Sequence, residues 1–325
     1  MKLKKILTGA AILLTLCTSI FAKSKLKVVT TIFPEYDWTR EIIGNTKSAD
    51  LTLLVGSGVD LHSYQPSIQD ITKIATADIF IYVGGESDAW VDAALKNATN
   101  KNMTIINLME VLGDKVKVEE LKEGMQESEH EHEHEDEDHH HEDNEEKEYD
   151  EHVWLSVRNA KILCAEITNV LCQKDSANAS KYRANLSAYT AKLDTLDSKF
   201  AAAVNNGSKK TILVCDRFPF RYFVEDYGLD YFAAFVGCSA ETEASFETVI
   251  FLSKKVDELG LNTVLKIESG DGKIARTVVQ NSKAKNATVL SLDSMQSVTV
   301  KQATSGTTYL KIMESNLKIL EQALK

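Results

Sequence analysis

Hydrophobic and polar positions alternate along this chain in two repeating patterns, which predict strands and helices in turn. The first set has predicted strands at residues 26–31, 50–55, 79–83 and 104–107, and predicted helices at 34–43, 69–75 and 89–97. The second set has predicted strands at 211–215, 231–235, 263–267 and 288–292, and predicted helices at 220–227, 246–259, 273–282 and 307–324. Such alternation is typical of α/β folds. We therefore predict two α/β lobes, each a small, mostly parallel sheet with flanking helices.

A long helical pattern separates the two sets. Residues 157–172 have helical periodicity, and apolar side chains then recur at heptad-like spacing from residue 178 to 204, with no Gly or Pro before Gly207. These side chains are Tyr182, Leu186, Tyr189, Leu193, Leu196 and Phe200. A helix of about 27 residues is ~40 Å long. The pattern predicts an N-terminal lobe at 23–175, one long rigid linking helix at 176–206 and a C-terminal lobe at 207–325.

The N-terminal residues predict export. Lys2, Lys4 and Lys5 precede an uncharged apolar stretch at 6–20, which is the pattern of a secretory signal peptide and is too short for a membrane-spanning helix. Cleavage after Ala22 would remove residues 1–22 as the signal peptide. The run LTLC at 14–17 faintly resembles a lipidation signal, so a lipid anchor on Cys17 is the alternative. In both cases the mature protein is expected in the periplasm or another extracytoplasmic space.

The acidic charge of the chain is concentrated in one tract. Of 48 acidic and 37 basic residues, 15 acidic residues and a single lysine lie between residues 127 and 151. The rest of the chain is close to neutral and has no basic surface for nucleic acid.

The same tract holds six of the eight histidines, which are His130, His132, His134, His139, His140 and His141. Imidazole is a preferred ligand of Zn²⁺, and the interleaved carboxylates raise the local cation concentration. Residues 129–142 contain no apolar side chain with which to fold. We therefore predict that residues 126–151 form a disordered loop that binds metal weakly, at several exchangeable sites.

The remaining two histidines are isolated in the sequence. His62 lies in a glycine-containing loop after a predicted strand, and His152 lies at the start of a predicted helix just beyond the acidic tract. Ligands of α/β sheets bind at the loops that follow the carboxyl ends of strands. Both residues are therefore candidate metal ligands, with an ordinary surface or hydrogen-bonded histidine as the alternative at each position.

The cysteines of the mature chain do not form a metal-binding motif. Cys164, Cys172, Cys215 and Cys238 have no C-x-x-C spacing. In an oxidising compartment, a Cys215–Cys238 disulfide and buried free thiols are equally compatible with the sequence.

Several motifs, in order along the chain, resemble the zinc- and manganese-type solute-binding proteins of ABC transporters, the ZnuA- and TroA-like class. They are VTTIFP at 29–34, GVDLHSYQPS at 58–67, YVGGESDAW at 82–90, EHVWL at 151–155, FRYF at 220–223, YG at 227–228 and TYL at 308–310. The histidine-rich tract lies where the zinc-binding members of that class carry theirs, directly before the second histidine motif. The resemblance covers nearly the whole mature chain and implies a metal ion held between two lobes.

The resemblance also implies the metal ligands. The two histidines of the first lobe correspond to His62 and His152, and a late aspartate corresponds to Asp293 in the run SLDS at 291–294. One further ligand, a His or Glu ahead of the F-x-Y-F motif, falls on Arg217. A guanidinium group cannot bind a metal because it stays protonated.

Three carboxylates could take the place of that missing ligand. Asp216 is the first candidate if the loop at 216–219 carries an insertion, and Glu243 and Glu268 are the alternatives. Two histidines with two carboxylates would suit both Zn²⁺ and Mn²⁺. The histidine tract favours zinc, because manganese prefers oxygen ligands.

The resemblance implies a monomeric receptor that delivers a metal ion to the permease of an ABC importer. With the histidine tract, it predicts Zn²⁺ as that ion, with Mn²⁺ as the less favoured alternative. The chain is not expected to be an enzyme, since it has no H-E-x-x-H, G-x-S-x-G or P-loop motif. A zinc hydrolase would also need an open coordination position. The other alternative is a metal-buffering or adhesive surface protein that serves no permease.

Overall fold

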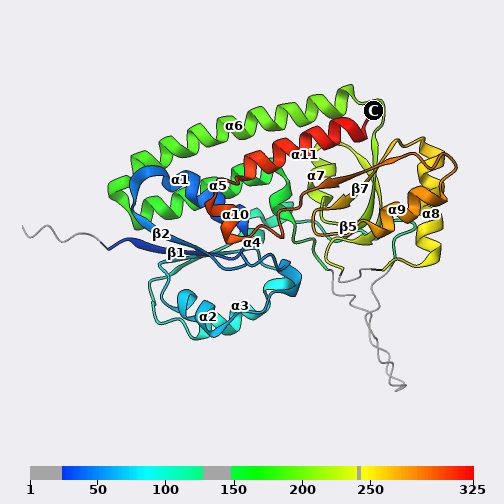
Figure 1. Ribbon diagram of the computed structural model, residues 1–325. Helices are drawn as coiled ribbons and strands as arrows, with labels where there is room; N and C mark the ends of the chain where they lie inside the picture. The colour runs from blue at the N-terminus through cyan, green and yellow to red at the C-terminus, as the bar shows by residue number, and fades with distance from the viewer. Residues whose placement is uncertain (1–23, 127–147, 240–242) are drawn as a thin grey trace, which may run out of the picture.

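The computed structural model describes residues 24–126, 148–239 and 243–325, which form two α/β lobes side by side under one long helix (Figure 1). The predicted signal peptide with Cys17, and the six histidines of the acidic tract, lie outside the described residues. In the described ranges, no helix combines the length and the apolar character that crossing a membrane requires.

The N-terminal lobe is a four-stranded parallel sheet with the order β2-β1-β3-β4. Its strands are β1 (Leu26–Thr30), β2 (Ala49–Leu53), β3 (Ile79–Tyr82) and β4 (Thr104–Asn107), and its helices are α1 (Phe33–Ile43), α2 (Ile68–Ala75), α3 (Trp90–Lys96) and α4 (Leu108–Leu112). Successive strand residues point to opposite faces. Val28 therefore packs under α1, and Val29 packs against the side of the sheet that α2 and α3 cover.

The C-terminal lobe repeats this plan with the order β6-β5-β7-β8, again fully parallel. Its elements are β5 (Thr211–Phe218), α7 (Arg221–Tyr227), β6 (Asp230–Val236), α8 (Phe246–Leu259), β7 (Thr263–Ile267), α9 (Lys273–Asn281) and β8 (Thr288–Leu292). The two-sheet α/β prediction is confirmed. Strand β5 continues three residues beyond the predicted end, with a shift of register between Val214 and Arg217.

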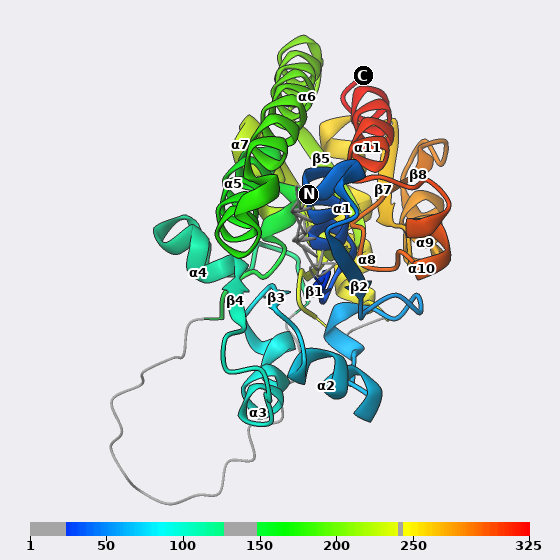
Figure 2. The same cartoon turned by 90° about the vertical axis from the view of Figure 1, so that its left-hand side faces the viewer.

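The long linking helix is present as α6 (Ala179–Asn206), which follows α5 (Val157–Lys174) and a 3₁₀ turn at Ser176–Asn178. Its buried face carries the predicted apolar series, from Tyr182 through Leu193 to Phe200. In Figure 2 this helix lies above α1 and α5, which cover the N-terminal sheet. One continuous apolar core, under α6, contains side chains from both sheets. The lobes are therefore packed together and not merely tethered.

The chain also returns from the C-terminal lobe to the N-terminal lobe after β8. Helix α10 (Val300–Thr304) begins where Val300 N donates to Gly56 O at 2.7 Å, and Arg40 of α1 donates to the carbonyls of Ala303 and Thr307. Helix α11 (Tyr309–Ala323) then runs back beneath α6 (Figure 1). The two lobes thus have a second covalent connection in addition to α6.

Residues 116–126 and 148–150, which flank the acidic tract, lie against the C-terminal lobe. Val118 and Tyr149 form an antiparallel bridge, and Gln126 pairs with Phe235 of β6 through a hydrogen bond from Gln126 N to Ala234 O at 2.9 Å. Both ends of the tract therefore start from the C-terminal side of the molecule, although they precede α6 in sequence.

Candidate metal centre

The carboxyl ends of the two parallel sheets provide the loops of one shared site. His62 lies in a 3₁₀ turn (Leu61–Ser63) after β2, where the Asp60 side chain accepts a hydrogen bond from His62 N at 3.1 Å. Ser87 follows β3, and Cys238 follows β6. His152 directly precedes the 3₁₀ turn Val153–Leu155 and is fully buried. This is the position at which α/β sheets bind ligands.

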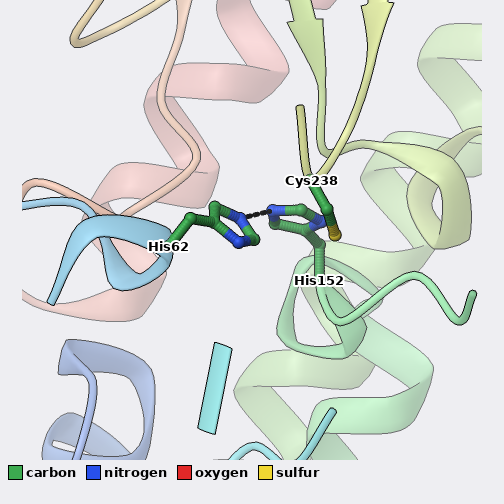
Figure 3. A group of neighbouring side chains, drawn as sticks. All are labelled: His62, His152 and Cys238. Atoms are coloured by element: carbon green, nitrogen blue, oxygen red, sulfur yellow. Dashed lines mark hydrogen bonds between the residues drawn. The ribbon is translucent and has the colours of Figure 1, made fainter. Parts of the chain in front are cut away.

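The two isolated histidines meet between the lobes. Their Nε2 atoms are 3.1 Å apart, and the rings approach each other in a tilted arrangement (Figure 3). His152 Nδ1 lies 3.0 Å from Asp150 Oδ1, and His62 Nδ1 lies 2.6 Å from Ser87 Oγ. An oxygen partner on Nδ1 fixes the ring orientation and leaves Nε2 as the metal-binding atom. The pair is thus held in the arrangement that metal-binding histidines have in proteins.

The surroundings give the two rings different proton affinities. Burial, together with the nearby His152, lowers the pKa of His62 to about 3. Burial also opposes the charged form of His152, but the Asp150 carboxylate outweighs it and raises the pKa of His152. His62 is therefore neutral at pH 7, while His152 holds a proton more tightly than a free imidazole does. A metal ion that binds His152 has to compete with that proton.

Cys238 completes the group. Within the described residues, a ring nitrogen of His62, a ring nitrogen of His152 and the sulfur of Cys238 all lie within 4.8 Å of one another. In Figure 3 the Cys238 side chain lies beside the His152 ring, at the end of the turn that follows β6. Gly237 makes this approach feasible, because a Cβ there would stand 3.1 Å from the His152 ring and 2.9 Å from Phe218 O.

A cavity of about 460 Å³ opens on one side of the pair, lined by His62, Asp60, Asp216 and Arg217 among others. The Arg217 guanidinium binds Asp60 across the lobes at 2.6 Å and lies 3.4 Å from Ser239 O. Arg217 therefore ties the His62 loop to the turn that carries Cys238.

Gln296, from the segment after β8, closes the site from the C-terminal lobe. With its amide oxygen facing His152, that oxygen lies 2.6 Å from His152 Nε2, and its nitrogen donates to Asp60 Oδ2 at 2.7 Å. The amide thus bridges the two loops from which Asp60 and His152 come. It also places an oxygen donor next to the histidine pair.

A second, smaller cavity of about 210 Å³ lies on the other side of His62 and Cys238 and is lined by Glu119 and Glu151 among others. Glu151 Oε1 accepts a hydrogen bond from Ser87 N at 2.8 Å. Glu151 Oε2 is buried, lies 3.7 Å from His62 Nδ1 and accepts no hydrogen bond from any described residue. This acidic cavity is next to the point at which the histidine tract returns to the fold.

Residues 28–323 match the family model described as the periplasmic zinc-uptake complex component A, ZnuA. The chain belongs to this family. The ZnuA family consists of solute-binding proteins for zinc uptake, and the order of motifs along the sequence predicted this membership.

Known relatives agree with this membership. The chain is 31% identical over 319 residues to the zinc-binding protein AdcA of Streptococcus pyogenes, and the match covers 94% of the chain and 58% of AdcA. It thus spans little more than half of that relative. It is 30% identical over 300 residues to the high-affinity zinc uptake system protein ZnuA of Bacillus subtilis, covering 92% of the chain and 88% of the relative.

Solved structures share the fold. The Zn(II)-bound ZnuA-like domain of AdcA from Streptococcus pneumoniae aligns with a TM-score of 0.70 at 26% identity, over 93% of this chain and 99% of that domain. The metal-dependent lipoprotein YcdH of B. subtilis aligns with a TM-score of 0.72 at 26% identity, over 92% and 99% of the two chains.

Within the described residues, none of the four predicted carboxylates joins the group whose ligand atoms are within 4.8 Å. Asp216 lines the larger cavity, where its Oδ1 accepts a hydrogen bond from Arg217 N at 3.0 Å. Glu243 lines the same cavity, but its side chain is 86% exposed and faces Lys273 at 3.8 Å.

The two later carboxylates are engaged by the segment after β8. Glu268 accepts hydrogen bonds from the backbone and hydroxyl of Ser294 and from the Ser297 hydroxyl. Asp293 Oδ1 accepts from Met295 N at 2.8 Å. Burial, together with the charge of Glu268, raises the pKa of Asp293 to about 6. In this arrangement both carboxylates hold the backbone that presents Gln296.

Sequence reasoning did not identify Cys238 or Gln296 as site residues. Cys164, Cys172, Cys215 and Cys238 are all free thiols in the structure, so the Cys215–Cys238 disulfide is absent. Cys215 is buried in the core of the C-terminal lobe, on β5. The available signal was the Gly237-Cys238 pair two residues after the predicted strand at 231–235, which places the thiol at the carboxyl edge of the sheet.

Proposed function

We propose that this protein is the extracytoplasmic receptor of an ABC importer and carries Zn²⁺ between its lobes on His62 and His152. The observation that carries the proposal is the meeting of two histidines, 90 positions apart in the chain, with their Nε2 atoms 3.1 Å apart. Two nitrogens bound to one tetrahedral zinc at ~2.0–2.1 Å stand about 3.3 Å from each other. The two nitrogens are therefore already at the separation that one zinc ion requires, and a turn of the rings would direct both lone pairs at it.

The buried location supports carriage of the metal. A receptor that transports an ion surrounds it with protein ligands, whereas a hydrolytic zinc site keeps one position open for water. His152 is fully buried, and Gln296 and the ion pair of Asp60 with Arg217 close the site from the C-terminal lobe. We therefore propose a closed carrier site and no catalytic role.

Zinc is favoured over manganese by the chemistry of the nearby donors. Imidazole nitrogens suit Zn²⁺, whereas Mn²⁺ prefers carboxylate, carbonyl and water oxygens. In the described part of the chain, the predicted carboxylates Asp216 and Asp293 are outside the group that surrounds the histidine pair. The names of AdcA and ZnuA relatives point in the same direction.

Delivery would take place at the membrane. A permease would bind the loaded receptor, and release would require Arg217 to separate from Asp60 and Gln296 to separate from His152. The chain is expected to act as a monomer, exported by its signal peptide or anchored through Cys17. The histidine tract would concentrate zinc beside the acidic cavity that contains Glu151.

Calorimetric titration of the metal-free protein with Zn²⁺ and with Mn²⁺ tests the proposal. We expect one tight zinc site that disappears in the double variant His62→Ala, His152→Ala, and much weaker binding of manganese. Deletion of residues 129–142 is the matched control, which should remove the weak sites and keep the tight one. If zinc binding were unchanged by the double variant, the site between the lobes would be refuted.

Zinc uptake by cells separates the receptor from the other candidate functions. Deletion of the gene should abolish growth in zinc-depleted medium, and the double histidine variant should fail to restore it. Normal uptake without the protein would instead support a metal-buffering or adhesive role. Hydrolysis of a substrate above background that depends on His62 would support an enzyme.

A further inference from the structure

We propose that Cys238 is a direct ligand of the transported metal, so that the site is a thiolate–histidine site selective for zinc. This inference rests on the proposed function. It concerns the third metal ligand. The motif position for this ligand holds Arg217, and none of the predicted carboxylates lies in the group with the two histidines.

The first argument is geometric. The Cys238 sulfur is within 4.8 Å of ring nitrogens of both histidines. A sulfur at ~2.3 Å and a nitrogen at ~2.0 Å on one tetrahedral zinc stand about 3.6 Å apart. The separations in this group therefore exceed those on a common zinc by at most about 1.2 Å.

The second argument is that the position expected for the third ligand is taken by a residue that cannot bind metal. Arg217 stands where the sequence motif places the third ligand, and its guanidinium is already bound to Asp60. The same guanidinium lies 3.4 Å from the carbonyl of Ser239, the residue next to Cys238. Arg217 thus holds the turn after β6 against the His62 loop. Arg217 thus occupies the position of the expected third ligand without binding metal. Its contact with Ser239 O also holds the turn on which the Cys238 thiol lies.

The third argument is the way the turn is built. Gly237 lets the backbone lie close to the His152 ring, where a Cβ would stand 3.1 Å from the ring and 2.9 Å from Phe218 O. Cys238 N donates to Glu119 Oε1 at 2.8 Å, which anchors the turn on the segment before the histidine tract. A free cysteine in a purely structural role needs neither this close approach nor this anchor.

The acidic cavity gives metal ions access to the thiol. Cys238, His62, Glu119 and Glu151 all line it. A divalent cation would enter along carboxylates, and the thiol proton would leave to solvent as the sulfur binds the metal. With two nitrogens and one sulfur in place, the Gln296 oxygen or a water molecule can take the fourth position of a tetrahedral site.

The consequence is a stronger preference for zinc than two histidines alone would give. Thiolate sulfur suits zinc and is a poor ligand for manganese. Loss of an outer partner of a metal ligand already reduces metal affinity by ~10–100-fold. Loss of the thiolate itself in Cys238→Ser should therefore lower zinc affinity by at least about 100-fold.

Cobalt(II) is the probe, because a bound thiolate gives it a sulfur-to-metal charge-transfer band in the near ultraviolet. One equivalent of Co²⁺ is added to the reduced, metal-free protein, to Cys238→Ser, and to Cys172→Ser as the matched control. Cys172 lies on α5, away from the site, and its sulfur contacts Ala179 O at 3.6 Å, a contact that serine can also make. We expect the band in the wild type and in Cys172→Ser, and its loss in Cys238→Ser with the visible cobalt bands retained.

The outcomes distinguish this inference from the proposed function. Cobalt bound through His62 and His152 without the charge-transfer band, and zinc affinity of Cys238→Ser within about threefold of wild type, would overturn the thiolate ligand and leave the receptor in place. Absence of any tight site that depends on the histidines would overturn both. Cys238→Asp replaces the sulfur donor with a carboxylate oxygen and should shift the metal preference toward manganese. An unchanged ratio of zinc to manganese affinity would also contradict the inference.

Discussion

The ion pair between Asp60 and Arg217 is a direct polar link between the lobes at the metal site, and its contribution to stability can be measured by a double-mutant cycle. The two charged groups approach to 2.6 Å, with 17% of the Asp60 side chain and 15% of the Arg217 side chain exposed. Two unit charges ~4 Å apart attract each other by about 4 kcal/mol at an effective dielectric constant of 20. Solvent screening of the exposed part and desolvation reduce this value. We expect a coupling energy of about 1–3 kcal/mol.

The cycle compares Asp60→Asn, Arg217→Met and the double variant by urea unfolding at pH 7. Asparagine keeps an oxygen that can accept the hydrogen bond from His62 N, and methionine keeps much of the volume of the arginine stem. Lys25 and Asp50 provide the control pair, because they approach to 2.7 Å but their side chains are 52% and 65% exposed. Their coupling should not exceed about 0.5 kcal/mol. Equal coupling energies for the two pairs would refute the reasoning from burial.

The pH dependence of the coupling gives a second test of the same ion pair. Burial opposes the charged form of Asp60, but the charge of Arg217, with the hydrogen bonds from Arg217 and from His62 N, outweighs it and lowers the pKa of Asp60. A carboxyl whose pKa is lower in the folded state adds stability above its unfolded pKa, which is about 3.9. That stability is lost as the pH falls through the folded pKa. The coupling should therefore be constant between pH 5 and 7 and disappear under strongly acidic conditions.

Three further predictions concern the surroundings of the site. Burial raises the pKa of Asp88 to about 7, so stability should fall as the pH rises from about 4 to 7. In urea unfolding, Asp88→Asn should therefore be more stable than wild type at pH 8, by at most about 4 kcal/mol, with little difference near pH 4; equal stabilities at pH 8 would contradict the prediction. Tyr309→Phe leaves the buried Trp154 carbonyl without its 2.8 Å hydrogen bond and should lower the free energy of unfolding by about 1–3 kcal/mol in the same assay. Gly237→Ala should weaken zinc binding in calorimetry, because its Cβ meets the His152 ring. The control is Gly228→Ala, where the Cβ has open space but φ is +66°, so that only stability should fall, by about 1–2 kcal/mol. Equal zinc affinities of the two variants would contradict the prediction.

The fold could be predicted because its signals are local. Strand and helix periods, and the uninterrupted apolar series from Tyr182 to Phe200, are properties of neighbouring residues, and they placed both sheets and α6 within a few residues of their limits. Helices α4 and α10 were not predicted because each has only five residues, too few to establish a period.

The site could be predicted only in part, because its contacts join remote segments. His62 and His152 were selected because they stand apart from the tract and follow loop signals, and the structure brings them together. The Gly237-Cys238 pair places a thiol at the carboxyl edge of the second sheet, but no local pattern indicates that this turn reaches the two histidines. The register shift before Arg217 is equally invisible to local patterns, because it arises from pairing with β6. The ligand set beyond the histidines therefore needed the tertiary structure.

The shared core determines how such a receptor could release its metal. Side chains of both sheets pack into one continuous apolar cluster under α6, and α11 adds its buried face to the same cluster. A wide hinge motion that exposed only about 400 Å² of this core would cost ~10 kcal/mol at ~25 cal/mol per Å², which is comparable to the whole stability of a typical domain. Release by such a motion is therefore unfavourable. The loops that carry His62, Cys238 and Gln296 lie at the edge of this core and are joined across the lobes by polar contacts. Separation of these loops can open the site while α6 and the core stay intact.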